Sequence, residues 1–343
     1  MRLGITLPSR TNPIVSLGDK ARRAEDAGFD SVWSYEVYRN PFIILSQAAA
    51  ATSTVTIGSG LAAAFSRSPF VSANAAADID EISGGRFLYG LGTGVPEFMK
   101  AFHSTDAERP LRRLSEYVDV LRLSWQYLNT GTAPRFEGQY YQFKPPRGNP
   151  WGERDMPREQ IPIALAAMGP KLLQLVGEKA DAWLGYFVTP EYFADFCHGH
   201  LETGAHKAGR SVSDIRVVAE TVCSVHEDSG VAMQRARRQV GFYATHSAGA
   251  QVATVHGLES AVKNLRRGFI DKGIAAFEET PDELVDLLSI TGTPSEVRNK
   301  LAKFEGFVDD LILHTPYVPP IKADESSDSF DNILSAFGGS EYL

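Results

Sequence analysis

The chain has few cysteines and no long hydrophobic segment, and both absences restrict its class. Only Cys197 and Cys223 occur among the 343 residues, so a disulfide framework is excluded and a reducing compartment is expected. No apolar stretch ending in a cleavage site follows Met1, so we expect a cytoplasmic protein without a signal peptide. The long uncharged run over residues 40–66 is broken by polar residues and glycines, so we expect no membrane span.

Basic residues are too few for a typical nucleic-acid-binding protein. Lys and Arg number 34 against 42 for Asp and Glu, which gives a net charge of −8. This acidic balance, without a long basic run, argues against nucleic acid as a partner. Because 43% of the residues are hydrophobic and 22% are charged, the composition predicts a folded globular chain. A small-molecule substrate is therefore the expected partner.

The residue patterns of metal sites and of serine hydrolases are also lacking. Cys197-His-Gly-His200 carries three ligand-type side chains, but at this helical spacing they converge poorly and no fourth ligand accompanies them. We therefore expect no metal. The segment that begins at Gly58 reads Gly-Ser-Gly, which lacks the Gly-x-Ser-x-Gly spacing of a nucleophile elbow.

Strand-like and helix-like segments alternate along the chain. Segments at residues 16–27, 41–51, 70–82, 171–179 and 191–207 have helical character. Short apolar or β-branched segments precede or follow these helices at residues 3–7, 29–33, 54–57, 86–91, 161–166, 182–186, 215–225 and 310–313. A strand that returns after each helix favours parallel pairing with right-handed crossovers. Eight such units predict an α/β fold of the TIM (β/α)8 barrel type.

The length exceeds that of a typical barrel of about 250 residues, so insertions are required. We expect one domain over residues 1–343, with insertions at about 130–160 and 234–290. The polar stretch 323–329 suggests a loop before a last short helix. The Ala-rich second and third helices would suit the interface of a homo-oligomer, although they could equally pack tightly on the barrel.

In a barrel of this type, ligands bind at the carboxyl ends of the strands, so residues that follow strands are candidates. Glu36 follows the second strand and would face the mouth, unless it is a solvated loop residue. Small residues over 58–64 follow the third strand and would allow a flat ligand to approach the backbone. After the fourth strand, Gly90-Leu-Gly-Thr-Gly94 lacks the dinucleotide fingerprint spacing, so ligand contact and a plain turn both remain open.

Two further candidates concern an anion and the substrate. Ala167-Met-Gly-Pro-Lys171 leads from the fifth strand into a helix, and free N–H groups beside a lysine would bind a phosphate. An ordinary strand-to-helix turn is the alternative. His103 and His314 both follow strands and are candidates for substrate contact.

Several motifs together resemble the luciferase-like flavin and deazaflavin oxidoreductases. The most specific is Ser83-Gly-Gly-Arg-Phe87 followed by the Gly90–Gly94 segment. Further matching segments are Ala24-Glu-Asp-Ala-Gly-Phe-Asp-Ser-Val-Trp33, Arg67-Ser-Pro69, Ala167–Lys171 and Gly292-Thr-Pro-Ser-Glu-Val297. The resemblance extends from the first strand to about residue 317.

Within this family, the chain resembles the branch that uses the 5-deazaflavin coenzyme F420, which includes methylene-tetrahydromethanopterin reductases. The resemblance implies a non-prolyl cis peptide at Gly60-Leu61 against the deazaflavin ring. It also implies cofactor contacts from these residues: Glu36, Gly60, Leu61, Ala63, Thr93, Gly94, Ala167, Met168, Gly169, Pro170 and Lys171. Glu36 would in addition be catalytic, by relaying a proton. Lys171, Arg135 and Arg147 could receive the acidic tail of the coenzyme.

Two departures restrict the activity that the resemblance implies. F420-dependent sugar-phosphate dehydrogenases carry a histidine and a glutamate at positions that are Val37 and Val95 here, so sugar-phosphate oxidation is not expected. We expect hydride transfer between coenzyme F420 and a small, less polar organic substrate. An FMN-dependent two-component monooxygenase is the first alternative, and a non-catalytic flavin-binding protein is the second.

Overall fold

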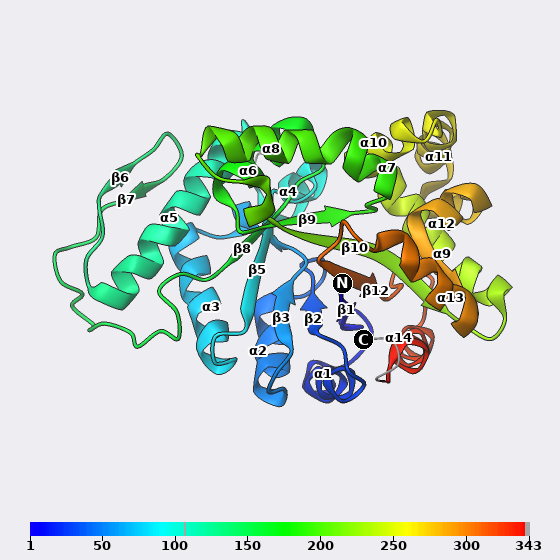
Figure 1. Cartoon of the computed structure of the whole chain (residues 1–343), viewed down its shortest axis with the longest axis horizontal. Helices are drawn as coiled ribbons and strands as arrows, with labels where there is room; N and C mark the ends of the chain where they lie inside the picture. Colours follow the sequence, from blue (N-terminus) through cyan, green and yellow to red (C-terminus); the bar gives the residue numbers. More distant parts are fainter. Residues whose placement is uncertain (106–107, 340–343) are drawn as a thin grey trace.

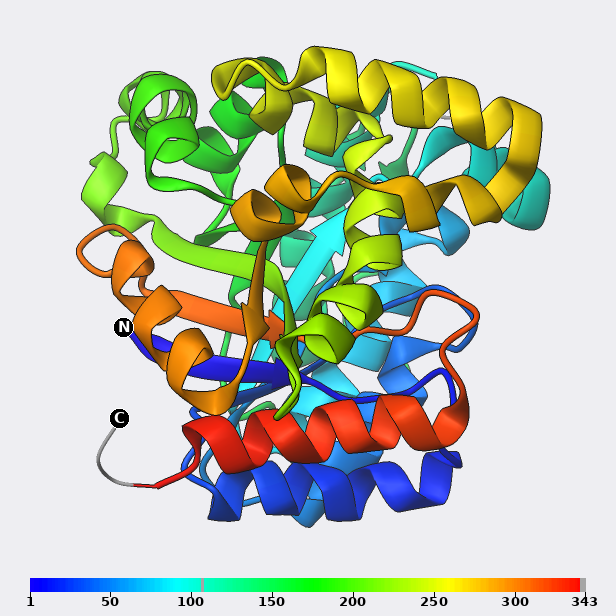
Figure 2. The same ribbon diagram turned by 90° about the vertical axis from the view of Figure 1, so that its right-hand side faces the viewer.

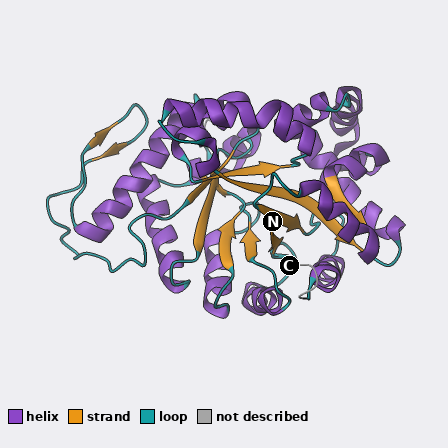
Figure 3. Cartoon of the chain, viewed as in Figure 1, coloured by secondary structure: helices purple, strands orange, loops and turns teal. Residues whose placement is uncertain are grey.

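Eight parallel strands pair in a closed ring, and helices cover its outer face (Figure 1; Figure 3). This computed structural model describes residues 1–105 and 108–339. In order around the ring, the strands are β1 (Arg2–Thr6), β2 (Ser31–Ser34), β3 (Thr56–Ser59), β5 (Phe87–Gly92), β8 (Ile163–Ala166), β9 (Ala182–Tyr186), β10 (Arg216–Val225) and β12 (Asp310–His314). Pairing of β12 with β1 closes the ring. The predicted TIM-barrel fold is confirmed.

Two short strands extend the barrel sheet outside this ring. β4 (Ala62–Ala63) pairs with the end of β5. β11 (Ser289–Gly292) pairs with the second half of β10, whose first half pairs with β9 and β12. β10 therefore extends beyond its neighbours in the barrel and supports the segments inserted after it.

Many of the surrounding helices begin at a proline or follow a polar capping residue. The helices are α1 (Leu17–Asp26), α2 (Pro41–Ala51), α3 (Pro69–Ile82), α4 (Pro96–His103), α5 (Pro110–Thr130), α6 (Pro170–Lys179), α7 (Pro190–Tyr192), α8 (His198–Lys207), α9 (Ser229–Ala244), α10 (Ser247–Val255), α11 (Glu259–Lys272), α12 (Asp282–Leu288), α13 (Pro294–Leu301) and α14 (Ala323–Phe337). Proline suits a first helical turn because it has no N–H to leave unpaired. The Asn40 side chain caps α2 by accepting a hydrogen bond from the N–H of Phe42 at 3.0 Å.

The polar stretch 323–329 is helical, so the prediction of a loop there was wrong. It forms the first turns of α14, which begins at Ala323. Ser327 faces the neighbouring α1, where it accepts a hydrogen bond from Lys20 at 2.8 Å. Ser329 is buried and donates to the carbonyl of Glu325. Polar residues at the packed face hid the helical period of α14, which lies along α1 (Figure 2).

Residues 131–160 carry a small hairpin of β6 (Phe136–Glu137) and β7 (Gln142–Phe143) on the outer side of α5 (Figure 1). The Glu116 carboxylate on α5 anchors it by accepting hydrogen bonds from the N–H groups of Gln139 at 2.9 Å and Tyr140 at 2.7 Å. Burial raises the pKa of Glu116, but these hydrogen bonds outweigh burial and the net shift is downward. Arg135 and Arg147 flank this hairpin and are exposed.

Residues 234–290 hold most of α9, then α10, α11, a 3₁₀ segment η5 (Gly273–Glu279), α12 and the start of β11. These elements form one group, drawn in yellow and orange tones, beside the barrel (Figure 2). α9 packs against β10, β11 and α12, so it connects this group to the barrel.

The barrel interior is filled by side chains that alternate along the strands. Trp33, Leu88, Ala164, Leu184, Val218 and Ile312 form its central cluster, together with Ala182. The indole of Trp33 lies over Gly4 and Gly58, where added Cβ atoms would lie 2.9 Å and 2.3 Å from the ring. Glycine at these two strand positions therefore makes room for the tryptophan.

Aspartates tie the strands together at the amino-terminal end of the barrel. Asp30, Asp181 and Asp309 each accept a hydrogen bond from a strand N–H, those of Leu3, Ile163 and Val217, at 2.8, 2.8 and 2.7 Å. Asp310, which is 1% exposed, pairs with Arg216 and Arg2. This end of the barrel is therefore built from structural hydrogen bonds and ion pairs.

Over residues 1–105 and 108–339, we find no helix with both the length and the hydrophobicity needed to cross a bilayer.

Candidate functional site

The predicted cofactor residues come together at the carboxyl ends of three neighbouring strands. β3 and β4 both pair with β5, and β5 pairs with β8. The residues at these strand ends that remain partly exposed are Gly60, Leu61, Thr93, Gly94, Met168 and Gly169. Ala63 and Ala167 are buried beside them. The peptide bond between Gly60 and Leu61 is cis, as the resemblance implies.

Glu36 makes an internal ion pair at this edge. One carboxylate oxygen, Oε2, accepts hydrogen bonds from the N–H of Ala63 at 2.7 Å and from Nη1 of Arg67 at 2.9 Å. The backbone N–H of Glu36 donates to the carbonyl of Leu61 at 3.0 Å. Glu36 thus fixes the segment from Leu61 to Ala63, and its side chain is only 10% exposed.

Burial and the neighbouring Glu36 both shift the pKa of Arg67. Burial lowers the pKa of its guanidinium, but the hydrogen bonds and the negative charge of Glu36 outweigh burial, so the net shift is upward. Arg67 also lies over the ring of Phe42, 5.2 Å from its centroid. The ion pair is therefore part of the fold at this edge. Arg67 belongs to the Arg67-Ser-Pro69 motif of the resemblance, but it was not among the predicted site residues.

The glycines in the second half of β5 and just after it have steric roles. A Cβ on Gly90 would lie 1.6 Å from the carbonyl oxygen of Ser59, so only glycine lets β5 approach β3 this closely. A Cβ on Gly92 would lie 2.7 Å from the side chain of Leu61. Gly94 has a φ of +71°, which side chains rarely adopt. These glycines bring Leu61 against β5.

The turn from β8 into α6 leaves the start of the helix open. No side chain caps α6 at its N-cap Gly169, and a Cβ there would find no atom within 4 Å. The two preceding carbonyls are already occupied: Trp183 donates to Ala167 and Tyr192 donates to Met168, both at 2.7 Å. Side chains of the core thus hold the turn in place, and Gly169 borders open space. Pro170 and Lys171 are exposed at this start.

Arg135 and Arg147 do not share this location. They flank the hairpin of β6 and β7, whereas Lys171 is in the first turn of α6. Figure 1 shows this hairpin and α6 apart from one another.

Two polar side chains lie across the mouth of the barrel from the small residues at the ends of β3, β5 and β8. Glu220 on β10 and His314 at the end of β12 follow the inward-facing Val218 and Ile312 by two residues, so they point into the barrel one layer nearer the mouth. Oε1 of Glu220 lies 2.6 Å from Nδ1 of His314, and the two side chains are 5% and 2% exposed. This is an ion-pair distance, although the imidazole is not oriented for a hydrogen bond.

His314 was predicted from the sequence and Glu220 was not. A charged residue inside the apolar run of β10, Val217-Val-Ala-Glu-Thr-Val-Cys223, is the signal that could have identified it. His103, the other histidine candidate, is exposed at the end of α4, so the structure gives the two histidines different environments.

Tyrosines enclose the Glu220–His314 pair. Tyr35 and Tyr317 stack on one another with centroids 4.7 Å apart, and their centroids lie 5.0 and 5.4 Å from that of His314. The Tyr186 hydroxyl lies 3.4 Å from Nδ1 of His314. Burial raises the pKa of Tyr35, Tyr186 and Tyr317, so these hydroxyls stay neutral over the ordinary pH range.

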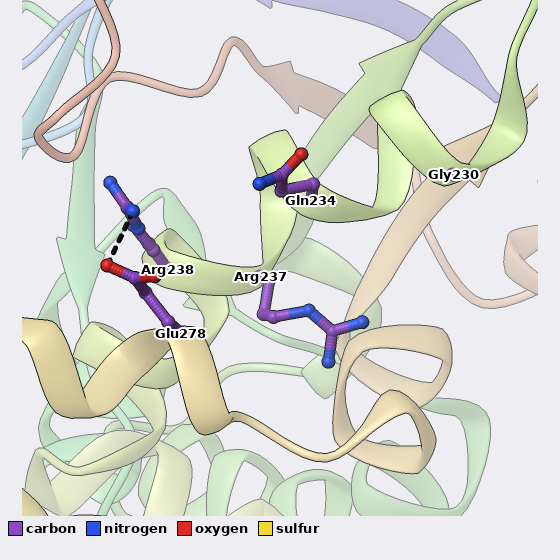
Figure 4. A pocket seen from close by; sticks show the side chains of 5 residues that line it. All are labelled: Gly230, Gln234, Arg237, Arg238 and Glu278. Carbon is purple, nitrogen blue, oxygen red and sulfur yellow. Dashed lines mark ion pairs between the residues drawn. The ribbon is translucent and has the colours of Figure 1, made fainter.

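A cavity elsewhere in the protein is a weaker candidate for a functional site. A cavity of about 350 Å³ lies on the face of α9 away from the tyrosines, and its lining includes Arg237, Arg238 and Glu278 (Figure 4). Its two arginines already have partners, because Arg238 pairs with Glu278 at 2.7 Å and Arg237 with Asp282. Among the described residues, no group of three or more His, Cys, Asp or Glu side chains is arranged to hold a metal ion.

Comparisons with known proteins agree with this architecture. The sequence profile described as Luciferase-like monooxygenase matches residues 1–311. The 5,10-methylenetetrahydromethanopterin reductase of Archaeoglobus fulgidus is 32% identical over 312 residues, which cover 87% of this chain and 89% of that protein.

Solved structures show the same fold. The coenzyme F420-dependent tetrahydromethanopterin reductase of Methanopyrus kandleri superposes with a TM-score of 0.79 at 24% identity, covering 98% of this chain and 99% of that one. The oxygenating constituent of 3,6-diketocamphane monooxygenase of Pseudomonas putida, in complex with FMN, gives a TM-score of 0.67 at 16% identity, covering 100% and 98% of the two chains. This chain therefore belongs to the luciferase-like family of flavin- and F420-dependent oxidoreductases.

Proposed function

We propose that the protein is a coenzyme F420-dependent oxidoreductase that transfers a hydride between the deazaflavin and a small organic substrate. The observation that carries this proposal is the pairing of two features at one edge of the barrel. A partly exposed strip of small residues at the ends of β3, β5 and β8 suits the face of a planar ring. The open start of α6 beside it suits the phosphate that both F420 and FMN carry.

The residues fit such a cofactor on steric and chemical grounds. At Gly60, a Cβ would meet its nearest neighbours at 3.5 Å, and at Gly169 it would meet none, so both positions leave space toward the mouth. The deazaflavin supplies the hydride chemistry through its C5 position when bound. The chain supplies the position: Glu36 and Arg67 hold the segment over which the ring would lie, and Gly169 and Lys171 would bind the phosphate.

The choice of F420 over FMN rests on the relatives, because the 32% identical protein bears the name of a methanopterin reductase and the M. kandleri structure is described as F420-dependent. We further propose a cytoplasmic location, since both cysteines are free and buried.

A direct titration tests the proposal. Purified protein freed of ligand is titrated with F420 and with FMN, and binding is followed by the fluorescence and absorbance of each cofactor. We expect F420 to bind with a dissociation constant at least about tenfold below that of FMN, equivalent to about 1.4 kcal/mol. Tight binding of FMN alone, together with oxygen uptake when reduced FMN is supplied, would identify a monooxygenase instead.

A further inference from the structure

The Glu220–His314 pair is a buried polar group that the proposed cofactor site leaves unexplained. Nε2 of His314 has no hydrogen-bond partner in the part of the chain that the structure describes. A buried donor or acceptor without a partner costs about 1–3 kcal/mol, so such an atom in a folded protein calls for an explanation, of which a catalytic role is one. The pair therefore requires a function.

The pair lies next to the place proposed for the ring. Oε2 of Glu220 would lie 3.5 Å from a Cβ at Gly60, so the carboxylate touches the segment that the ring would cover. Oε1 of the same carboxylate faces Nδ1 of His314. When the ring proton is on Nδ1, the lone pair of Nε2 is free to accept a proton from another group. The carboxylate of Glu220, at ion-pair distance from Nδ1, would then stabilise the cationic imidazole by its charge.

Over residues 1–105 and 108–339, the other side chains around the pair keep a constant charge over the ordinary pH range. The side chains that face the pair are Tyr35 after β2, Tyr186 on β9, Tyr317 after β12, and Gln239 and Tyr243 on α9. Burial raises the pKa of each of these four tyrosines, and Gln239 does not titrate. Arg10, whose charge acts on Tyr35, is a constant cation. Glu220 and His314 are therefore the acid–base groups that the geometry offers at this place.

We infer that Glu220 and His314 are a proton-transfer pair and that the substrate is a carbonyl compound or the corresponding alcohol. This inference rests on the proposed function, because it needs the deazaflavin as hydride acceptor. A substrate that accepts a hydride alone, such as an iminium ion, needs no acid or base. Hydride transfer to or from a carbon that bears oxygen needs one, because the oxygen must gain or lose a proton.

In the oxidative direction, the substrate loses one hydrogen from carbon and one from oxygen. The C–H bond of the carbinol carbon breaks, and its hydrogen leaves with both electrons for C5 of the bound deazaflavin. The O–H proton bonds to Nε2 of His314, and the C–O bond becomes a carbonyl. The alcohol is oxidised, the deazaflavin is reduced, and the imidazolium later returns its proton to water. The reverse reaction uses the same groups in the opposite order.

Substitutions at the pair separate this role from a structural one. His314→Gln and Glu220→Gln are compared with His206→Gln and Glu305→Gln, which make the same changes at exposed positions away from the mouth. We expect deazaflavin affinity to stay within about threefold in all four variants. With short ketones and secondary alcohols as a substrate panel, turnover at saturating cofactor should fall by about 10²–10⁴-fold in His314→Gln, and by less in Glu220→Gln.

A binding measurement on the unmodified protein gives a second readout. A tertiary alcohol has no carbinol hydrogen and cannot lose hydride, so it reports binding alone. His314 is the buried residue among the eight histidines, so in protein labelled with ¹⁵N-histidine its N–H should exchange most slowly with water. We expect short tertiary alcohols to shift the Nε2 resonance of this histidine when deazaflavin is present.

The outcomes distinguish the two proposals. If deazaflavin binds but no ketone or alcohol is converted and the Nε2 resonance does not move, the inference is wrong and the proposed function stands. If His314→Gln turns over ketones at the rate of the unmodified protein, the pair is structural and the inference is again wrong. If deazaflavin does not bind at all, both proposals fail.

Discussion

Glu36 and Arg67 form a two-point ion pair at the mouth of the barrel, with Nη1 of Arg67 2.9 Å from one carboxylate oxygen and Nη2 facing the other. Because the same carboxylate accepts the N–H of Ala63, the pair ties two chain segments together. The Glu36 carboxylate accepts four hydrogen bonds, from the N–H of Ala63, the Ser66 hydroxyl and two nitrogens of Arg67, so it is well placed to hold the cofactor segment. The contacts favour a positioning role for Glu36, and its role as a proton relay stays a prediction.

We expect Glu36→Gln to weaken this tie and to act on binding rather than on the rate. Loss of the charge-assisted hydrogen bonds should lower the free energy of unfolding by about 1.5–3 kcal/mol, measured by urea denaturation. Deazaflavin affinity should fall by about tenfold, while turnover at saturating cofactor changes little. The double variant with Arg67→Met should recover part of the lost stability, as a double-mutant cycle would show. A loss of turnover of about 10²-fold or more at saturating cofactor would instead make Glu36 an acid–base group.

The open start of α6 predicts a variant that gains stability and loses affinity. Gly169 has an extended backbone (φ −100°, ψ 160°), which suits an aspartate N-cap. Gly169→Asp should therefore raise the free energy of unfolding by about 0.3–1 kcal/mol. The same carboxylate would repel a phosphate and should weaken binding of F420 by at least about tenfold. Ser335→Asp on α14 adds an equal charge at an exposed position and serves as the control. Unchanged F420 affinity in Gly169→Asp would place the phosphate elsewhere.

The anchoring of the hairpin by Glu116 should depend on pH. The pKa of Glu116 is lowered in the folded protein, so its contribution is present above the unfolded value of about 4.3 and is lost as the pH falls through the lower folded value. We expect Glu116→Gln to speed hydrogen exchange at the amides of Gln139 and Tyr140 at pH 7. The difference from the unmodified protein should shrink below about pH 4. A difference that is constant with pH would show that the carboxylate charge does not matter.

Exposed apolar side chains predict self-association. Ile43 in the first turn of α2 and Phe70 and Val71 in the first turn of α3 are 51%, 38% and 56% exposed, and the two helices are neighbours. We expect a homodimer at micromolar concentration, measured by light scattering, and a shift toward monomer in Val71→Glu. Val15→Glu, at an exposed apolar residue before α1, is the control. A monomeric unmodified protein would contradict the expectation.

The sequence predicted the barrel well because each strand is a short apolar segment between clear helix signals. The strand at residues 310–313 and the helix at 41–51 both form where the pattern places them. The pattern failed at α14, where serines lie in a packed interface and remove the apolar period.

The candidate site was predicted only in part, for physical reasons. Motifs mark residues that lie close together in the chain, so the residues at the ends of β3, β5 and β8 could be named. Arg67 and Glu220 act through partners that are distant in sequence: Glu36 lies 31 residues from Arg67, and His314 is on a different strand from Glu220. The members of such pairs come together only in the folded barrel, so no local sequence pattern identifies them.

The aspartates that bind strand N–H groups at the amino-terminal end of the barrel have an evolutionary consequence. Asp30, Asp181 and Asp309 maintain the folded ring from the rim opposite to the one where ligands would bind. Substitutions in the loops at the ligand rim therefore leave these hydrogen bonds intact. Specificity for new molecules can thus arise by exchange of loop residues, without changing the contacts that hold the strands of the ring together.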